Sequence, residues 1–212
     1  MSSLIKAKTV EDIDTCLKNG HKIDDFFSDD WLGTAFEYHC YNGKTKLAKH
    51  LVSKGCKITI TAFNYVCNKG HFELFEFLST KVDINELSNE NVTPLMSACS
   101  GNQIFITNAL LNMGADPNKT NRWGETAGHF ASQYGCVELI NLLFTFGANL
   151  NAEHIGHQTL LHRAVEGNNY DVVKKLLELK VNVTRVDKHG NTPLMIAELR
   201  NYQKIINELK NN

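Results

Sequence analysis

Thr93-Pro-Leu-Met-Ser-Ala98 is a six-residue pattern that returns in related form along the chain. Related hexapeptides begin at intervals of 33 residues, three times in succession: Thr126-Ala-Gly-His-Phe-Ala131, Thr159-Leu-Leu-His-Arg-Ala164 and Thr192-Pro-Leu-Met-Ile-Ala197. A second apolar run follows each hexapeptide at the same offset, at Ile106 to Leu111, Leu139 to Leu143, Val172 to Leu177 and Ile205 to Leu209. A fixed period of this length predicts a chain built from structural repeats.

Each repeat has the composition of two short helices. Threonine is a good N-cap, and the proline that follows it in two of the hexapeptides fits the first helical turn. The apolar residues of the second runs recur at helical spacing and form one face of a helix. Gly114 and Gly147 follow two of these runs, where a helix can end in the left-handed conformation. Neither helix can bury its apolar face alone, so neighbouring pairs must stack.

This pattern resembles the ankyrin repeat, whose signature is T-P-L-H-x-A within a 33-residue unit. The resemblance implies an all-α fold, a solenoid of stacked helix-turn-helix units with projecting β-turn fingers. We expect a single domain over residues 1–212, with polar cap units at both ends. The predicted units are an N-terminal cap over 1–32, internal units over 33–60, 61–87, 88–120, 121–153 and 154–186, and a C-terminal cap over 187–212.

Some units depart from the pattern. Thr61 begins a motif only 27 residues after Thr34, so we expect a truncated finger around Thr59 and Ile60. Gly128 stands inside a predicted helix, where glycine costs about 1 kcal/mol relative to alanine. Another unit carries Gly156-His157, which displaces the turn glycine by one place.

Composition limits the classes of function. The chain has 22 Lys and Arg against 23 Asp and Glu, a formal net charge of -1, which predicts no nucleic-acid-binding face. No segment approaches 18 consecutive apolar residues and the first residues lack an apolar signal region, so we expect no membrane span. The expected location is the cytoplasm, with the nucleus as the second choice.

Six cysteines occur without a C-x-x-C pair and are interpreted as reduced thiols. Cys40, Cys67 and Cys99 share one offset in three successive units. A redox or metal ladder is one interpretation. The preferred one is that each cysteine replaces the small buried alanine usual at this position.

Histidines offer the remaining candidate chemistry. His129 and His162 occupy the histidine position of the motif, which implies a structural hydrogen bond. His154, His157 and His162 match no familiar zinc spacing, so no metal site is predicted. No phosphate-binding, dinucleotide-binding or hydrolase motif is present, and the sequence predicts no catalytic residue and no cofactor.

The resemblance implies that partners are held by the turns and by the exposed side of each first helix. Trp123 beside Arg122 is the sharpest candidate, because Trp, Tyr and Arg are enriched in binding hot spots. The alternative is that Trp123 folds back and packs on a neighbouring turn. Asp30 and Trp31 are expected in an earlier turn. The candidate binding residues are Arg122, Trp123, Glu125, Gln133, Tyr134, His154, Ile155, Gln158, Glu166, Lys188, His189 and Arg200.

The leading hypothesis is a monomeric protein-interaction module, an adaptor, scaffold, inhibitor or assembly chaperone, that binds an unidentified protein partner along its concave face. One alternative is an enzyme, or a regulator controlled by a small ligand, that has the same ankyrin-repeat fold. That alternative requires a closed pocket with perturbed ionisable groups around His154, His157 and Glu166. Another alternative is that the chain is the targeting portion of a longer protein.

Overall fold

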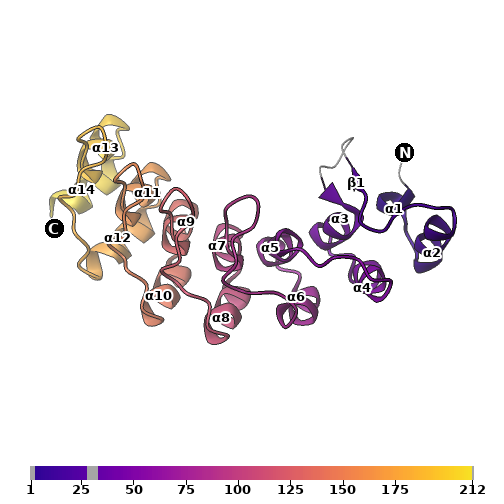
Figure 1. Ribbon diagram of the computed structural model, residues 1–212. Coiled ribbons are helices and arrows are strands. Elements are labelled where there is room, and N and C mark those ends of the chain that lie inside the picture. The colour runs from indigo at the N-terminus through magenta and orange to yellow at the C-terminus, as the bar shows by residue number, and fades with distance from the viewer. Residues whose placement is uncertain (1–2, 28–32, 212) are drawn as a thin grey trace.

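The computed structural model describes residues 3–27 and 33–211, and the predicted turn at Asp30 and Trp31 lies outside them. The chain forms a curved stack of helices, with first helices and fingers on the inner side of the curve (Figure 1). The first helices are α3 (Ala35–Tyr41), α5 (Ile60–Lys69), α7 (Pro94–Ser100), α9 (Ala127–Tyr134), α11 (Leu160–Glu166) and α13 (Pro193–Leu199). The second helices are α4 (Thr45–Ser53), α6 (Phe72–Ser79), α8 (Ile104–Asn112), α10 (Val137–Thr145), α12 (Tyr170–Glu178) and α14 (Gln203–Lys210).

The N-terminal end differs slightly from the other repeats. It contains the short helix α1 (Ser3–Lys6), the helix α2 (Val10–Lys18) and two short antiparallel strands, β1 (Phe26–Phe27) and β2 (Gly33–Thr34). Further along, α3 packs on α5, α5 on α7, α7 on α9 and α9 on α11. The prediction of an all-α solenoid is confirmed. The exact unit boundaries stay a prediction.

The repeated hexapeptides begin the first helices as predicted. The threonine that opens each one is the N-cap of its helix, and the Oγ1 atom of Thr93 accepts the N–H of Met96 at 3.2 Å. Pro94 and Pro193 fit the first turn because a helix leaves the N–H groups of that turn without partners.

Helix α5 has its N-cap two residues before the position that the motif at Thr61 would give. Its N-cap is Thr59, whose Oγ1 accepts the N–H of Ala62 at 3.1 Å. Residues 54–59 alone connect α4 to α5, whereas residues 80–93 connect α6 to α7, so the expected short connection is present. The Thr59 hydroxyl also donates to Glu37 at 2.8 Å, and Glu37 accepts the N–H of Thr34 at 2.9 Å. Glu37 thus joins two repeats where the motif usually has histidine.

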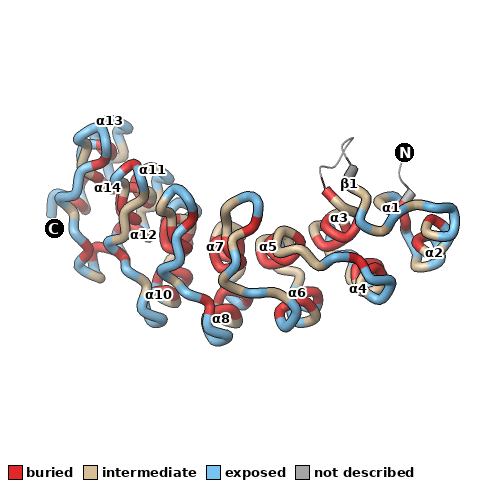
Figure 2. The backbone as a smooth tube through the Cα atoms, in the orientation of Figure 1, coloured by how far each residue is buried: buried red, intermediate tan, exposed pale blue. Residues whose placement is uncertain are grey.

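The core is a continuous layer between the stacked helices. Buried residues concentrate on the helices, and exposed residues on the connecting turns (Figure 2). All six cysteines are free and buried, which agrees with their interpretation as reduced thiols. Burial raises the pKa of the Cys99 thiol to about 12, and it raises the pKa of Cys40 and Cys67 well above the ordinary value. Such thiols are poor nucleophiles. In the described part of the chain, no helix has the length and apolar character to cross a bilayer.

Four fingers share one hairpin contact, a backbone N–H that donates to the carbonyl four residues later. The pairs are Ser88 to Val92 at 3.0 Å, Asn121 to Glu125 at 3.0 Å, His154 to Gln158 at 3.2 Å and Asp187 to Asn191 at 2.9 Å. At the tip, Gly124 and Gly190 have a positive φ of 78° and 80°, and His157 takes the equivalent position with a φ of 57°. The displaced glycine therefore leaves the hairpin contact intact and places a histidine in the left-handed conformation.

Candidate functional site

The finger that carries Arg122 and Trp123 is organised by a buried asparagine. The Oδ1 atom of Asn121 accepts the N–H groups of Trp123 and Glu125, both at 2.9 Å, and its Nδ2 donates to the Glu125 carboxylate at 2.9 Å. In the last finger, Asp187 accepts the N–H groups of His189 and Asn191 in the same way, at 2.8 and 2.9 Å. These contacts fix the backbone at the points where the side chains project.

Asn121 and Asp187 therefore act within the fold. Their recurrence at the 33-residue period, with Ser88 and His154 at the equivalent places, is the signal in the sequence that identifies this role. Ser88 accepts the N–H of Glu90 at 3.2 Å, and His154 Nδ1 accepts the N–H of Gly156 at 2.8 Å.

Arg122 and Trp123 form a stacked pair at the tip of this finger. The guanidinium carbon of Arg122 lies 4.1 Å from the centroid of the Trp123 ring. Trp123 keeps 37% of its surface exposed, and Arg122 is also exposed. The backbone carbonyl of Trp123 accepts the N–H of Ile155 at 2.8 Å and so joins the two neighbouring fingers. A partly exposed indole on a fixed backbone, covered on one side by a cation, is available for contact with another molecule.

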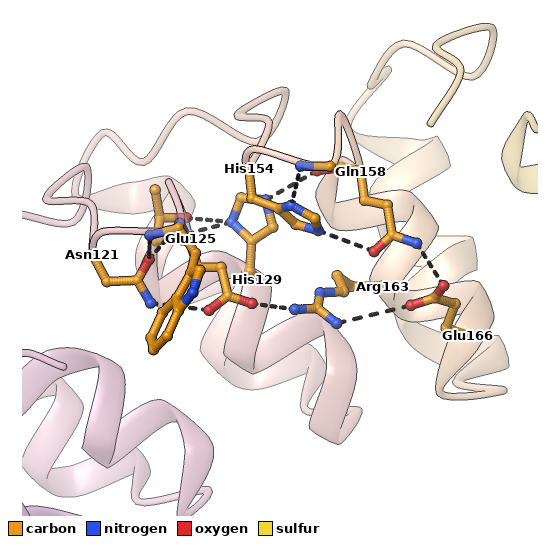
Figure 3. A network of polar contacts seen from close by, with 10 residues as sticks. Asn121, Glu125, His129, His154, Gln158, Arg163 and Glu166 are labelled. Atoms are coloured by element: carbon orange, nitrogen blue, oxygen red, sulfur yellow. Dashed lines mark hydrogen bonds and ion pairs between the residues drawn. The ribbon is translucent and has the colours of Figure 1, made fainter. Parts of the chain in front are cut away.

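A chain of polar contacts runs from this finger across the first helices (Figure 3). The Glu125 carboxylate pairs with the guanidinium of Arg163 on α11. Arg163 also lies 3.9 Å from Glu166, and Glu166 accepts a hydrogen bond from Gln158 at 2.5 Å. The Gln158 side chain in turn contacts His154 Nε2 at 3.0 Å. Four of the predicted binding residues are thus engaged within the protein.

Arg163 is the residue of this network that the sequence did not single out. It occupies the variable position of the T-P-L-H-x-A motif, which carries no signal of its own. Its side chain is 20% exposed and that of Glu125 is 15% exposed, so the pair is largely shielded from water. Its Nε atom is buried without a hydrogen-bond partner among the described residues.

The two motif histidines are structural. His129 Nδ1 accepts the N–H of Thr126 at 3.1 Å, and His129 Nε2 lies 3.3 Å from the carbonyl oxygen of Gln158 in the next finger. Burial lowers the pKa of His129 to about 4, so the ring is neutral at pH 7. His162 repeats this arrangement with Thr159 and Asn191, and burial lowers its pKa as well.

A groove of about 480 Å³ lies next to the network, between the last two fingers and the exposed ends of α11 and α13. Seven predicted binding residues line it: His154, Ile155, Gln158, Glu166, Lys188, His189 and Arg200. Of the remaining five, Arg122, Trp123 and Glu125 belong to the neighbouring finger. Gln133 and Tyr134 lie exposed at the end of α9, and Tyr134 has 56% of its surface exposed.

The groove does not assemble the histidine site required by the enzyme hypothesis. His157 is absent from its lining and instead lies 3.6 Å from Glu153, with 65% of its side chain exposed. His154 and Glu166 both reach the groove and are linked through Gln158. Within residues 3–27 and 33–211, no three His, Cys, Asp or Glu side chains are placed to hold a metal ion.

Comparison with known proteins agrees with this architecture. A family model described as ankyrin repeats (3 copies) matches residues 36–121, 105–187 and 128–212, which together cover most of the chain. The chain belongs to the ankyrin-repeat family. These matches indicate no catalytic family, and the ankyrin repeat is in general a protein-interaction module.

Several proteins similar to this chain are longer than it. An ankyrin repeat protein of fowlpox virus (strain NVSL) is 36% identical over 150 residues, which is 66% of this chain and 44% of the relative. The ankyrin repeat and SOCS box protein 5 of Bos taurus is 34% identical over 127 residues, 57% of this chain and 34% of the relative. The human transient receptor potential cation channel subfamily A member 1 is 26% identical over 193 residues, 82% of this chain and 17% of the relative. The ankyrin chain thus spans less than half the length of these three relatives.

Proposed function

We propose that this ankyrin-repeat chain binds a protein partner along the concave surface formed by α9, α11, α13 and their fingers. The observation that carries the proposal is the exposed, stacked pair of Arg122 and Trp123 on a finger whose backbone is fixed by Asn121. Aromatic and arginine side chains of this kind dominate the energy of protein interfaces.

The polar network supports the same proposal by its rigidity. Glu125 and Arg163 hold the finger to the following first helix, so the Arg122–Trp123 pair is in place before a partner arrives. A preorganised surface loses less conformational entropy on binding than a flexible one. Glu125, His154, Gln158 and Glu166 then serve mainly to position the surface, and the direct contacts come from Arg122, Trp123 and the exposed residues of the groove.

The role that fits is an adaptor, scaffold, inhibitor or assembly chaperone that acts as a monomer in the cytosol or nucleus. Among the relatives, the name of the ankyrin repeat and SOCS box protein 5 joins ankyrin repeats to a second module in one chain. The present chain can serve in the same way as the binding part of a longer protein.

Affinity capture from the native cell extract tests this function. Wild-type chain is compared with the double variant Arg122→Ala, Trp123→Ala and with Phe144→Ala, a control on α10 whose residue is 50% exposed. Circular dichroism first establishes that all three are folded. We expect one protein to be retained by the wild type and by Phe144→Ala and to be lost by the double variant. Equal retention by all three places the interface elsewhere and contradicts the proposal, and so does the absence of any specific partner.

A further inference from the structure

The groove between the last two fingers has an apolar centre. Ile196 on α13 lies at its base and is 7% exposed, while Ile155 and Leu199 line it with 68% and 73% of their surfaces in water. Two aliphatic side chains that remain so exposed beside a buried third form a surface on which a large apolar side chain can be desolvated.

Two acidic and two basic residues line the groove, and they differ in whether they already have partners within the protein. Both acidic residues of the groove are engaged: Glu166 with Gln158 and Arg163, and Asp187 with the backbone N–H groups of its own finger. By contrast, Lys188 and Arg200 are exposed, and neither forms an ion pair in the part of the chain that the structure describes. The charged groups of the groove that are available to a ligand are therefore the cations of Lys188 and Arg200, beside an aliphatic surface.

The groove also has the size of a ligand site. Its volume of about 480 Å³ falls within the range of about 300–1,000 Å³ that is typical of small binding pockets. A cavity of this size holds one large side chain and the atoms next to it, and not a folded domain. A segment that projects from a protein partner therefore fits this groove.

We propose that this groove binds a peptide segment of the partner in which a large aliphatic side chain stands next to a carboxylate. The aliphatic side chain packs on Ile196 between Ile155 and Leu199, and the carboxylate pairs with Arg200 and Lys188. This inference rests on the proposed protein-binding function and adds the chemistry of the segment recognised. The apolar contact supplies most of the affinity, and the charges select an acidic over a basic neighbour.

Titration of the full ¹⁵N-labelled chain with short capped peptides tests the proposal. The probe is Gly-Ser-Glu-Leu-Glu-Ser-Gly, and the matched controls replace its two glutamates by lysines or its leucine by serine. We expect saturable shifts of the backbone amides of Ile155, Ile196 and Leu199 with the probe. Each control should bind at least about tenfold more weakly, a difference of about 1.4 kcal/mol.

Reversal of the charge at Arg200 distinguishes charge-specific recognition from non-specific binding of peptides. Arg200 is the exposed C-cap residue of α13, and Arg200→Glu should weaken binding of the glutamate peptide by about tenfold and strengthen binding of the lysine peptide. Leu199→Ser should weaken both peptides. An unchanged order of affinities in Arg200→Glu overturns the charge assignment.

Three outcomes overturn the proposal: no groove shifts at millimolar peptide, equal binding of the glutamate and lysine peptides, or groove shifts that appear when the chain alone is concentrated. The last result identifies a second copy of the chain as the occupant. If the capture experiment succeeds and the peptides fail, this inference is wrong and the protein-binding function stands. If both fail, the function itself is contradicted.

Discussion

Arg163 on α11 pairs with Glu125 at the base of the preceding finger, so one guanidinium joins two successive repeats. In a solenoid, stability depends strongly on such contacts between neighbours, because each repeat touches only the units beside it. The same contact holds the finger that carries Arg122 and Trp123. Stability and the shape of the proposed binding surface therefore depend on one shielded ion pair.

Glu125→Gln tests this dependence. The substitution keeps the shape of the side chain and removes the charge that faces Arg163, which leaves a largely buried guanidinium with Glu166 at 3.9 Å as its remaining partner. We expect the free energy of unfolding, measured in urea, to fall by about 1–3 kcal/mol. The matched control is Glu198→Gln, which breaks the exposed pair with Lys210 and should cost less than about 1 kcal/mol. Equal losses in the two variants contradict the assigned role.

Gly128→Ala should destabilise the chain although alanine is the better helix former. A Cβ atom at this position would lie 2.7 Å from Cδ2 of Leu160, a side chain with no exposed surface. Overpacking of a core costs about 1–3 kcal/mol, and the gain of about 1 kcal/mol in helix propensity offsets part of it, so we expect a net loss of up to about 2 kcal/mol. In a Leu160→Ala background the added methyl group partly fills the cavity, and the same change should be neutral or stabilising. Thermal unfolding of the four proteins measures this coupling, and additive effects would refute it.

His157→Gly should stabilise the chain. His157 has a φ of 57°, where the equivalent residues of two other fingers are glycines. The left-handed conformation costs a non-glycine residue about 1–2 kcal/mol, and the entropy lost by glycine offsets part of this gain. We expect a net increase of about 0.5–1 kcal/mol in the free energy of unfolding. The reverse change, Gly190→Ala, where a Cβ atom would meet no neighbour within 4 Å, should cost a comparable amount, and a stabilising Gly190→Ala would show that the φ values do not control stability here.

Acid should weaken the stack through its buried histidines. In the unfolded chain His129 has its ordinary pKa of about 6.5, whereas burial lowers the pKa of His129 to about 4 in the folded chain. The stabilising contribution is therefore complete above pH 6.5 and is lost as the pH falls from 6.5 to 4, by about 1.4 kcal/mol per pH unit. Burial also lowers the pKa of His162, which adds in the same direction.

Urea unfolding between pH 4 and pH 7.5 measures this effect. His129→Gln removes the titrating group, so its stability should depend less steeply on pH in the window from 6.5 to 4. An equally steep dependence in the variant would assign the acid sensitivity to other groups.

The repeat period made the fold predictable, because the units that begin 33 residues apart share an N-cap threonine and similar buried positions. The sequence predicted the short connection near Thr59, but the motif at Thr61 gave no sign that Thr59 is the N-cap of α5. The cap position depends on the local bond of Thr59 to Ala62 and on its bond to Glu37 in the preceding repeat. The periodic pattern does not encode such contacts.

The sequence predicted where the candidate surface lies. It did not predict which of its residues are free to contact a partner and which bond within the protein. The motif offsets brought seven predicted residues to one groove. They gave no indication that Glu125, Gln158 and Glu166 bond within the protein, because this depends on which side chain stands across from each. Arg163 was missed for the same reason.

Site-specific photocrosslinking most directly tests the claim that the concave surface binds the partner. Tyr134 on α9 and Phe144 on α10 belong to one helix pair and are 56% and 50% exposed, so each can carry p-benzoylphenylalanine with little effect on folding. We expect a cell extract to yield a specific crosslinked protein from position 134 and none from position 144. A crosslink from position 144 alone would place the interface on the second helices and contradict the account.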